Sequence, residues 1–278
     1  MNRIAAKFAE LRKLNRAAFV PFITGGDPDL ETSFKILSRL PAAGADVIEL
    51  GIPFSDPMAD GPINQASYLR ALKAGMTLPK LVELVRRFRK SEATTPVVLM
   101  GAYNPIHAYG TARFMKDAAD AGVDGLLIVD VPVEEDDVLR APALAHGIDI
   151  IRFLAPTTDA ARLKVVLEGA GGYLYYASIA GITGTRSYAE SDVRAALARL
   201  RAATKLPVVV GFGIRTTEQA SEIARFADGA VVGSAIVSRI ESHVAGGTKS
   251  ADLVADVVEF CAALAKSVHA AVKDSVLG

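Results

Sequence analysis

The sequence predicts an α/β protein, a single-domain (β/α)8 TIM barrel over residues 1–278 with an extra N-terminal helix and short extra helices. Eight short apolar segments rich in β-branched residues lack polar alternation, so each is expected to be a strand buried on both faces of a parallel sheet. Helical patterns separate these segments, and eight strand–helix units are typical of a closed barrel. An open doubly wound sheet is the alternative, but no dinucleotide-binding glycine fingerprint follows the first strand.

The first third of the chain opens with an amphipathic helix, because Ile4, Phe8 and Leu11 recur on one face. The run AFVPFIT at 18–24 predicts the first strand, and apolar residues at helical spacing predict a helix at 29–42. The second strand is expected at 47–50. Gly61-Pro62 is expected to open the next helix, because proline suits the first helical position.

The same alternation continues to the end of the chain, without a linker-like or low-complexity stretch. The helix at 133–145 has acidic residues in its first turn, where the helix dipole favours them. Apolar β-branched runs predict strands at 96–100, 125–129, 148–154, 173–177, 207–211 and 229–232. Periodic apolar residues predict the remaining helices at 78–89, 160–167, 191–201 and 216–226, from 234, and at 253–272.

Composition indicates a large core and a neutral surface. Hydrophobic residues make up 51% of the chain, and 31 basic residues balance 31 acidic ones. A formal net charge of zero argues against binding to nucleic acid or to a membrane surface. No apolar stretch approaches the ~18 residues of a membrane span. The first 14 residues mix charges at helical spacing instead of forming a signal peptide, so a cytoplasmic location is expected.

Several kinds of catalysis are disfavoured by residue type. The single cysteine, Cys261, excludes an intramolecular disulfide and lies in an apolar run typical of a core thiol. The four histidines show no metal-ligand spacing, so no metal site is expected. No lysine lies in a strand or at its carboxyl end, which disfavours a Schiff base.

Two carboxylates are the candidates for acid–base chemistry. Glu49 is the one charged residue in the second strand, and strand parity puts it on the side opposite Ile48 and Leu50. If Ile48 and Leu50 pack on helices, Glu49 faces the barrel interior. Asp60 follows on a long proline-rich loop, from which it can swing over Glu49. The alternatives are a solvated strand-end glutamate and an ordinary Asp-Gly-Pro turn.

Glycine-rich segments end three later strands, where (β/α)8 barrels often bind phosphate. Glycine lets backbone N–H groups approach an anion, and a helix from Ser234 would direct its positive end there. Individually the glycines also suit ordinary turns, and Arg215 is the one nearby cation. The segments are Gly181-Ile182-Thr183-Gly184, Gly211-Phe212-Gly213 and Gly233-Ser234.

Apolar and aromatic residues are expected to face inward between this phosphate cup and Glu49. At the strand ends they would line a pocket for a flat hydrophobic group, and lower down they would simply fill the core. The implied ligand has a phosphate at one end and an aromatic ring at the other. The residues are Phe22, Met100, Leu127, Val129, Phe153, Tyr175 and Phe212.

Along essentially its whole length the chain resembles the tryptophan synthase α-subunit family. The resemblance lies in FITGGDPD, ELGIPFSDPMADGPINQAS, FLAPTT, GITG, GFGI and VVGSAIV, of which the second is highly specific. It implies a barrel that cleaves indole-3-glycerol phosphate to indole and glyceraldehyde 3-phosphate. By position, Glu49 and Asp60 match the catalytic carboxylates of the family. Gly184, Gly213, Gly233 and Ser234 match its phosphate cup, and Phe22, Tyr175 and Thr183 match residues around the indole and the closing loop.

The resemblance also implies roles. Glu49 would shuttle a proton between a hydroxyl and indole C3, Asp60 would accept the indole N–H, and Thr183 would hold Asp60 when the loops close. No cofactor is expected in this chain. The expected partner is a pyridoxal-phosphate β subunit, in an α2β2 assembly that passes indole through a tunnel. Gly101-Ala102 and Ile179-Ala180 depart from many relatives near the expected partner face, so they affect the interface more than the chemistry.

Three other functions remain as alternatives. Another phosphosugar barrel enzyme is disfavoured, because a related indole-pathway enzyme needs a lysine acid at a strand end. A non-catalytic activator of a β subunit has no chemical need for Glu49 and Asp60. A stand-alone indole producer would differ only in its kinetic coupling to a β subunit.

Overall fold

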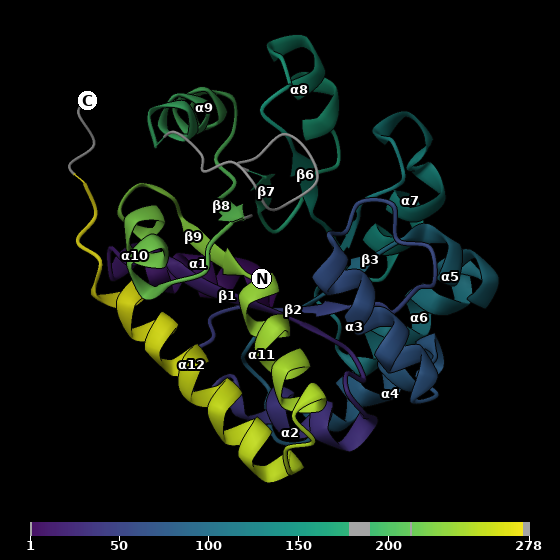
Figure 1. The fold of residues 1–278 in the computed structure, drawn as a ribbon. Helices are drawn as coiled ribbons and strands as arrows, with labels where there is room; N and C mark the ends of the chain where they lie inside the picture. The colour runs from purple at the N-terminus through teal and green to yellow at the C-terminus, as the bar shows by residue number, and fades with distance from the viewer. Residues whose placement is uncertain (1, 178–189, 212, 275–278) are drawn as a thin grey trace.

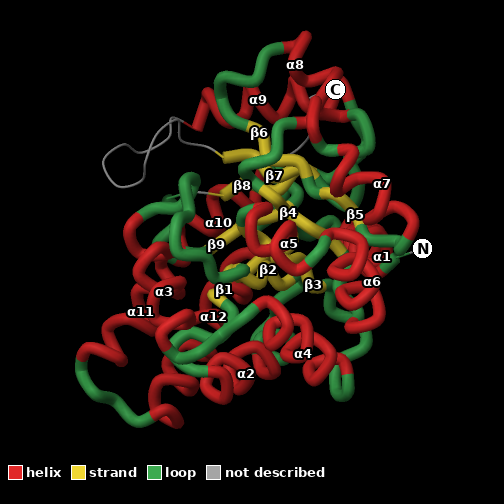
Figure 2. The backbone as a smooth tube through the Cα atoms, turned by 90° about the vertical axis from the view of Figure 1, so that its right-hand side faces the viewer, coloured by secondary structure: helices red, strands yellow, loops and turns green. Residues whose placement is uncertain are grey.

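The computed structural model describes residues 2–177, 190–211 and 213–274. Within them, parallel strands form a sheet at the centre of the molecule and helices surround it (Figure 1; Figure 2). The order of the strands in the sheet is β5-β4-β3-β2-β1-β9-β8-β7-β6. The strands are β1 (Ala18–Thr24), β2 (Ile48–Gly51), β3 (Val97–Gly101), β4 (Gly125–Ile128), β5 (Asp149–Ile150), β6 (Arg152–Leu154), β7 (Leu174–Ala177), β8 (Val208–Gly211) and β9 (Gly229–Val232).

The two edges of this sheet belong to one run of chain, which closes the barrel. β5 pairs with β4, β6 pairs with β7, and only Ile151 separates β5 from β6. The Ile151 N–H still donates to the Leu126 carbonyl at 2.8 Å, whereas Arg152 is already in register with Leu174. The expected strand at 148–154 therefore changes neighbour in its middle. The predicted (β/α)8 barrel is confirmed.

Alternate strand residues face the barrel interior or the surrounding helices. Around β2, Val47 belongs to the interior apolar cluster, whereas Ile48 and Leu50 belong to the cluster between strands and helices. Glu49 is fully buried and accepts a hydrogen bond from Tyr173, an interior residue. The inward orientation that strand parity predicts for Glu49 is confirmed.

The helix α1 (Arg3–Lys13) covers one end of the barrel interior. Its buried residues Ile4, Phe8 and Leu11 all belong to the interior cluster, as their spacing predicts. The Phe8 ring lies 5.8 Å from the ring of Tyr173, centroid to centroid. Among the described residues, apolar packing fills the interior at this end, and the cavity described below opens at the other end, where the strands finish.

The remaining helices lie outside the strands. The bounds of α4 and α8 agree with the expected 78–89 and 160–167, whereas α5 and α6 follow β3 where no range was predicted. Within the described ranges, no helix is both long and apolar enough to cross a membrane. The helices are α2 (Leu30–Arg39), α3 (Pro62–Lys73), α4 (Leu78–Arg89), α5 (Tyr103–Tyr109), α6 (Thr111–Ala121), the 3-10 turn η1 (Val133–Glu135), α7 (Asp137–Ala145), α8 (Ala160–Leu167), α9 (Glu190–Ala203), α10 (Thr217–Phe226), α11 (Ser234–Ala245) and α12 (Ser250–Ala270).

A buried carboxylate ties the start of β4 to its neighbours. Asp124 is 3% exposed and accepts hydrogen bonds from Arg89 at 2.7 Å, from Arg3 at 2.9 Å and from the Val97 N–H at 2.9 Å. Three donors for one buried carboxylate offset its desolvation. Removing the carboxylate would leave the Arg89 guanidinium buried without its charge partner.

We therefore expect Asp124→Ala to lower the free energy of unfolding by about 3 kcal/mol, the lower end of what breaking a buried ion pair costs. The matched control is Asp120→Ala, which removes an exposed ion pair with Lys116 on α6 and should change stability by less than ~0.5 kcal/mol. Urea denaturation measures both values. Equal effects of the two substitutions would contradict the structural role of Asp124.

Candidate active site

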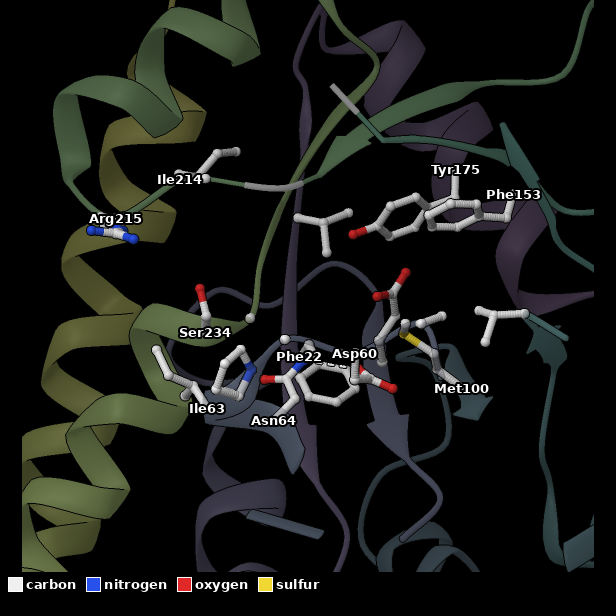
Figure 3. A pocket seen from close by; sticks show the side chains of 18 residues that line it. Phe22, Asp60, Ile63, Asn64, Met100, Phe153, Tyr175, Ile214, Arg215 and Ser234 are labelled. Atoms are coloured by element: carbon white, nitrogen blue, oxygen red, sulfur yellow. Dashed lines mark hydrogen bonds between the residues drawn. The ribbon is translucent and has the colours of Figure 1, made fainter. Parts of the chain in front are cut away.

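A cavity of about 260 Å³ opens where the strands end. Its wall combines carboxylates, aromatic rings and glycines from most of the barrel strands and from the start of α3 (Figure 3). Pockets of this kind, largely apolar with a few convergent polar groups, are the usual form of a small-molecule site. The lining residues are Phe22, Glu49, Ala59, Asp60, Gly61, Pro62, Ile63, Asn64, Met100, Val129, Phe153, Tyr175, Gly213, Ile214, Arg215, Val231, Gly233 and Ser234.

Glu49 is the most deeply buried ionisable group of this cavity, with 0% exposure. Its Oε1 accepts a hydrogen bond from the Tyr173 hydroxyl at 2.7 Å, while its Oε2 has no partner among the described residues. Burial raises the pKa of Glu49 to about 7, and the hydrogen bond from Tyr173 opposes that rise. Near neutral pH both forms of the carboxyl are populated, which is what a group that gives and takes a proton needs.

The contact between Tyr173 and Glu49 was not predicted from the sequence. A signal was present, because Tyr173 lies two residues before Tyr175 and so shares its side of the strand. The hydroxyl crosses the barrel interior to reach a carboxylate 124 positions away. Strand parity indicates the direction of the side chain but not this contact.

Asp60 lies two residues before α3, next to the N-cap Gly61, and is 8% exposed. Its Oδ1 accepts a hydrogen bond from the Asn64 side chain at 3.1 Å, and its carbonyl accepts one from Gln65 at 2.8 Å. Burial raises the pKa of Asp60, while the Asn64 amide and the nearby Tyr68 hydroxyl oppose the rise. Asp60 is therefore already held in the cavity wall by α3, whereas its sequence suggested a carboxylate on a swinging loop.

Aromatic side chains form one side of the cavity. The rings of Phe153 and Tyr175 are stacked, with centroids 5.2 Å apart and planes inclined by 18° (Figure 3). Phe22 and Met100 lie on the side of Asp60 in the same view. A Cβ on Gly51 would meet the Phe22 ring at 2.7 Å, so glycine is needed where β2 passes that ring. A flat ring bound here would contact aromatic and thioether groups.

The opposite side of the cavity has the features of an anion site. Gly233 caps α11, and the Ile236 and Val237 N–H groups donate to its carbonyl at 2.8 and 3.1 Å. The N–H groups of Ser234 and Ala235 precede these bonds, so they lie at the positive end of the helix. Gly213, with φ +79°, belongs to the same wall. Figure 3 shows Ser234 and Arg215 together, across the cavity from the stacked rings.

Most of the residues proposed from sequence line this cavity. They are Phe22, Glu49, Asp60, Met100, Val129, Phe153, Tyr175, Gly213, Gly233 and Ser234, with Arg215 as the expected nearby cation. Thr183, Gly184 and Phe212 lie outside the described residues. The contact expected between Thr183 and Asp60 therefore stays a prediction.

Two other proposed residues lie near the cavity but not in its wall. Leu127 is fully buried in the interior cluster, and Val129, two residues further along, lines the cavity instead. Gly211 leaves room for Tyr175, because a Cβ on Gly211 would lie 2.0 Å from the Tyr175 hydroxyl. The sequence predicts the inward side of the strand for Leu127, but not how deep Leu127 lies along the barrel.

The start of α3 contributes lining residues that sequence reasoning missed, among them Ile63 and Asn64. The sequence indicates only that a helix begins at Gly61-Pro62, and it does not predict that the first turn of this helix faces the cavity. Within residues 2–177, 190–211 and 213–274, no group of three or more His, Cys, Asp and Glu side chains is arranged to hold a metal ion.

Fold and cavity together define a (β/α)8-barrel protein with a buried carboxylate in a cavity at the carboxyl ends of its strands. A profile of the tryptophan synthase alpha chain family matches residues 8–269. The tryptophan synthase alpha chain of Gluconacetobacter diazotrophicus is 52% identical over 270 residues, which cover 97% of this chain and 98% of that one. The chain belongs to the tryptophan synthase alpha chain family.

Solved structures agree with this assignment. The alpha subunit of tryptophan synthase from Legionella pneumophila superposes with a TM-score of 0.88 at 36% identity, covering 96% of this chain and 98% of that one. A chain of Mycobacterium tuberculosis tryptophan synthase superposes with a TM-score of 0.86 at 32% identity, covering 96% and 98%. The likeness extends over nearly the whole length of each chain.

Proposed function

We propose that this chain is a lyase that cleaves indole-3-glycerol phosphate to indole and glyceraldehyde 3-phosphate, the activity that its family implies. One observation supports this most strongly. Glu49, fully buried and with a pKa raised to about 7, shares a cavity with the amino-terminal end of α11. Aromatic walls lie in the same cavity, so a substrate with a phosphate and an indole ring can present its scissile bond to Glu49.

In this proposal Glu49 enters the reaction as the neutral acid. Its O–H transfers a proton to C3 of the indole ring, and the carboxylate that remains takes the proton of the hydroxyl on the attached carbon. The carbon–carbon bond then breaks, the hydroxyl carbon becomes the aldehyde of glyceraldehyde 3-phosphate, and the electron pair of the bond restores the aromatic ring. Glu49 ends the cycle protonated, so the reaction consumes no external acid or base.

Asp60 is proposed to stabilise the charge that this protonation creates. Protonating C3 leaves a positive charge on the indole nitrogen, and a carboxylate that accepts its N–H lowers the energy of that state. The hydrogen bond from Asn64 and the position before the first turn of α3 both favour the ionised form of Asp60. The two carboxyl groups can thus carry different charges at the same pH. Glu49 must be neutral to act as the acid, and Asp60 must be ionised to stabilise the positive charge.

The phosphate is proposed to bind at the start of α11, with Gly213, Gly233 and Ser234 around it and Gly184 as a further member of the cup. Backbone N–H groups and the helix dipole suit a phosphate dianion there. Arg215 adds a cation in the same wall. The dipoles are fixed before the substrate arrives, so binding needs little reorganisation.

The expected partner is a tryptophan synthase β subunit, which would carry pyridoxal phosphate and receive the indole, in an α2β2 assembly. Met58, on the loop after β2, is 90% exposed, as an apolar docking residue would be before association. The Asp130 side chain accepts a hydrogen bond from the Tyr103 N–H at 2.8 Å and so joins two loops of the same barrel face. A cytoplasmic location belongs to the same proposal and suits the buried free thiol of Cys261.

The test is an indole-release assay with indole-3-glycerol phosphate, run with and without a β subunit. We expect indole in both cases, faster with the partner, and a much higher KM for the dephosphorylated substrate, indole glycerol. Stimulation of the β subunit without indole release would favour a non-catalytic activator. Indole release that the β subunit never changes would favour a stand-alone enzyme, and no indole under either condition would refute the proposal.

A further inference from the structure

The start of α3 carries three polar side chains at four-residue spacing. Asp60, Asn64 and Tyr68 follow one another at i, i+4 and i+8, so they lie along one face of the helix and its entry. The Asn64 amide donates to Asp60 at 3.1 Å. Tyr68 is 1% exposed and belongs to the interior cluster of the barrel. Asp60 and Asn64 therefore line the cavity, and Tyr68 lies in the barrel interior beside them.

Tyr68 is unusual among these groups because its buried hydroxyl has no hydrogen-bond partner among the described residues. It lies close enough to the Asp60 carboxylate to oppose the rise in the pKa of that group. Burial, the Asp60 carboxylate and, more weakly, Glu49 raise the pKa of Tyr68 well above its usual value, so the hydroxyl keeps its proton and can donate it in a hydrogen bond. A buried tyrosine hydroxyl normally has a partner, and an unpaired one costs about 1–3 kcal/mol.

The backbone is adapted to bring this tyrosine close. A Cβ on Gly51 would lie 3.2 Å from Tyr68 Cε1, a contact tighter than ordinary van der Waals packing. α3 therefore packs against the end of β2, the strand that carries Glu49. This approach brings the Tyr68 hydroxyl close enough to both carboxylates for each to affect its pKa.

We propose that Asn64 and Tyr68 form a clamp that positions Asp60 and keeps it ionised, with the Tyr68 hydroxyl donating to Asp60 when substrate fills the cavity. The clamp rests on the proposed function and adds two positioning residues to it. Asn64 holds Oδ1 from the helix side. Tyr68 supplies the second donor from the barrel interior. A carboxylate that accepts two hydrogen bonds stays in place to accept the indole N–H.

The other titratable groups around Asp60 do not replace the clamp. Glu49, from β2, repels the negative charge of Asp60 when it is ionised. When it is neutral, Glu49 carries no charge that could stabilise the Asp60 carboxylate. Tyr175, from β7, is fully buried, and burial is the main cause that raises its pKa, with Glu49 and Asp60 adding to the rise. Arg215 lies in the cavity wall with Ser234 at the anion site. The donors on α3 are therefore the groups that oppose the burial of Asp60.

The test is a carbon-13 NMR titration of the Asp60 carboxyl in the full-length chain with indole and glyceraldehyde 3-phosphate filling the cavity, together with the pH dependence of kcat for indole release, which reports the enzyme–substrate complex. In Tyr68→Phe we expect the Asp60 midpoint and the acid limb of kcat to rise by about one pH unit, because a hydrogen bond to a charged group has been lost. Asn64→Ala should move both in the same direction. The control is Tyr176→Phe, on the outer side of β7, which should move neither.

The outcomes separate the clamp from a merely structural role. An Asp60 midpoint unchanged in both variants would overturn the clamp, even if activity fell. Should Tyr68→Phe fail to fold, Asn64→Ala alone decides the question. A shifted midpoint in a chain that releases no indole would leave the clamp in place and refute the proposed reaction instead.

Discussion

Replacing Glu49 with glutamine is expected to lower the rate of indole release by roughly 10²–10⁴-fold, the usual contribution of a general acid–base group. Glutamine has nearly the same shape, and its carbonyl can still accept the hydrogen bond from Tyr173. It has no proton to transfer to indole C3 and cannot take one from the substrate hydroxyl. The loss should therefore appear in kcat, measured at saturating indole-3-glycerol phosphate.

A matched control for this variant is Glu83→Gln on α4. Glu83 is exposed and forms an ion pair with Arg86 on the helix surface, far along the chain from any cavity residue. Its substitution should leave kcat unchanged. Near-normal cleavage by Glu49→Gln would show that some other group moves the proton, and the assignment of Glu49 would then be wrong.

The same substitution is expected to stabilise the fold at alkaline pH. The pKa of Glu49 is about 7 in the folded chain against an ordinary value of 4.5. Between these values the folded state holds a proton that the unfolded state has released, so stability falls as pH rises through this window. At about 1.4 kcal/mol for each pH unit, the parent chain loses about 3 kcal/mol relative to acidic solution. Glutamine does not ionise, so Glu49→Gln avoids this loss.

Urea denaturation of parent and variant at pH 5 and pH 8.5 measures this effect. The advantage of Glu49→Gln should be small at pH 5 and should grow by up to about 3 kcal/mol at pH 8.5. An inactive variant that is also more stable is expected when a catalytic group is buried at the expense of stability. Identical pH dependence of parent and variant would mean that Glu49 titrates normally in the folded chain.

Strand parity and periodicity were sufficient to predict the barrel and the orientation of Glu49. Both depend on local rules, because a parallel strand alternates its side chains and an apolar strand without polar alternation must be covered on both sides. The change of neighbour at Ile151 follows no local rule. It arises because one strand must pair with β4 on one side and β7 on the other at different points along its length.

The sequence also did not predict how deep a given residue lies in the barrel. Leu127 is in register with Met100, yet Met100 lines the cavity and Leu127 does not. The stagger between strands and the reach of each side chain decide this, and neither is encoded in one segment. Tyr173 was missed for a related reason, since its hydroxyl contacts a residue on another strand.

The central claim is that Glu49 acts as a neutral acid in a cavity whose opposite wall binds phosphate. The most direct test is the pH dependence of kcat/KM for indole release by the unmodified chain, which reports the free enzyme. We expect activity to fall above about pH 7, as the Glu49 proton is lost. Activity that stayed constant or rose between pH 7 and pH 9 would contradict the claim.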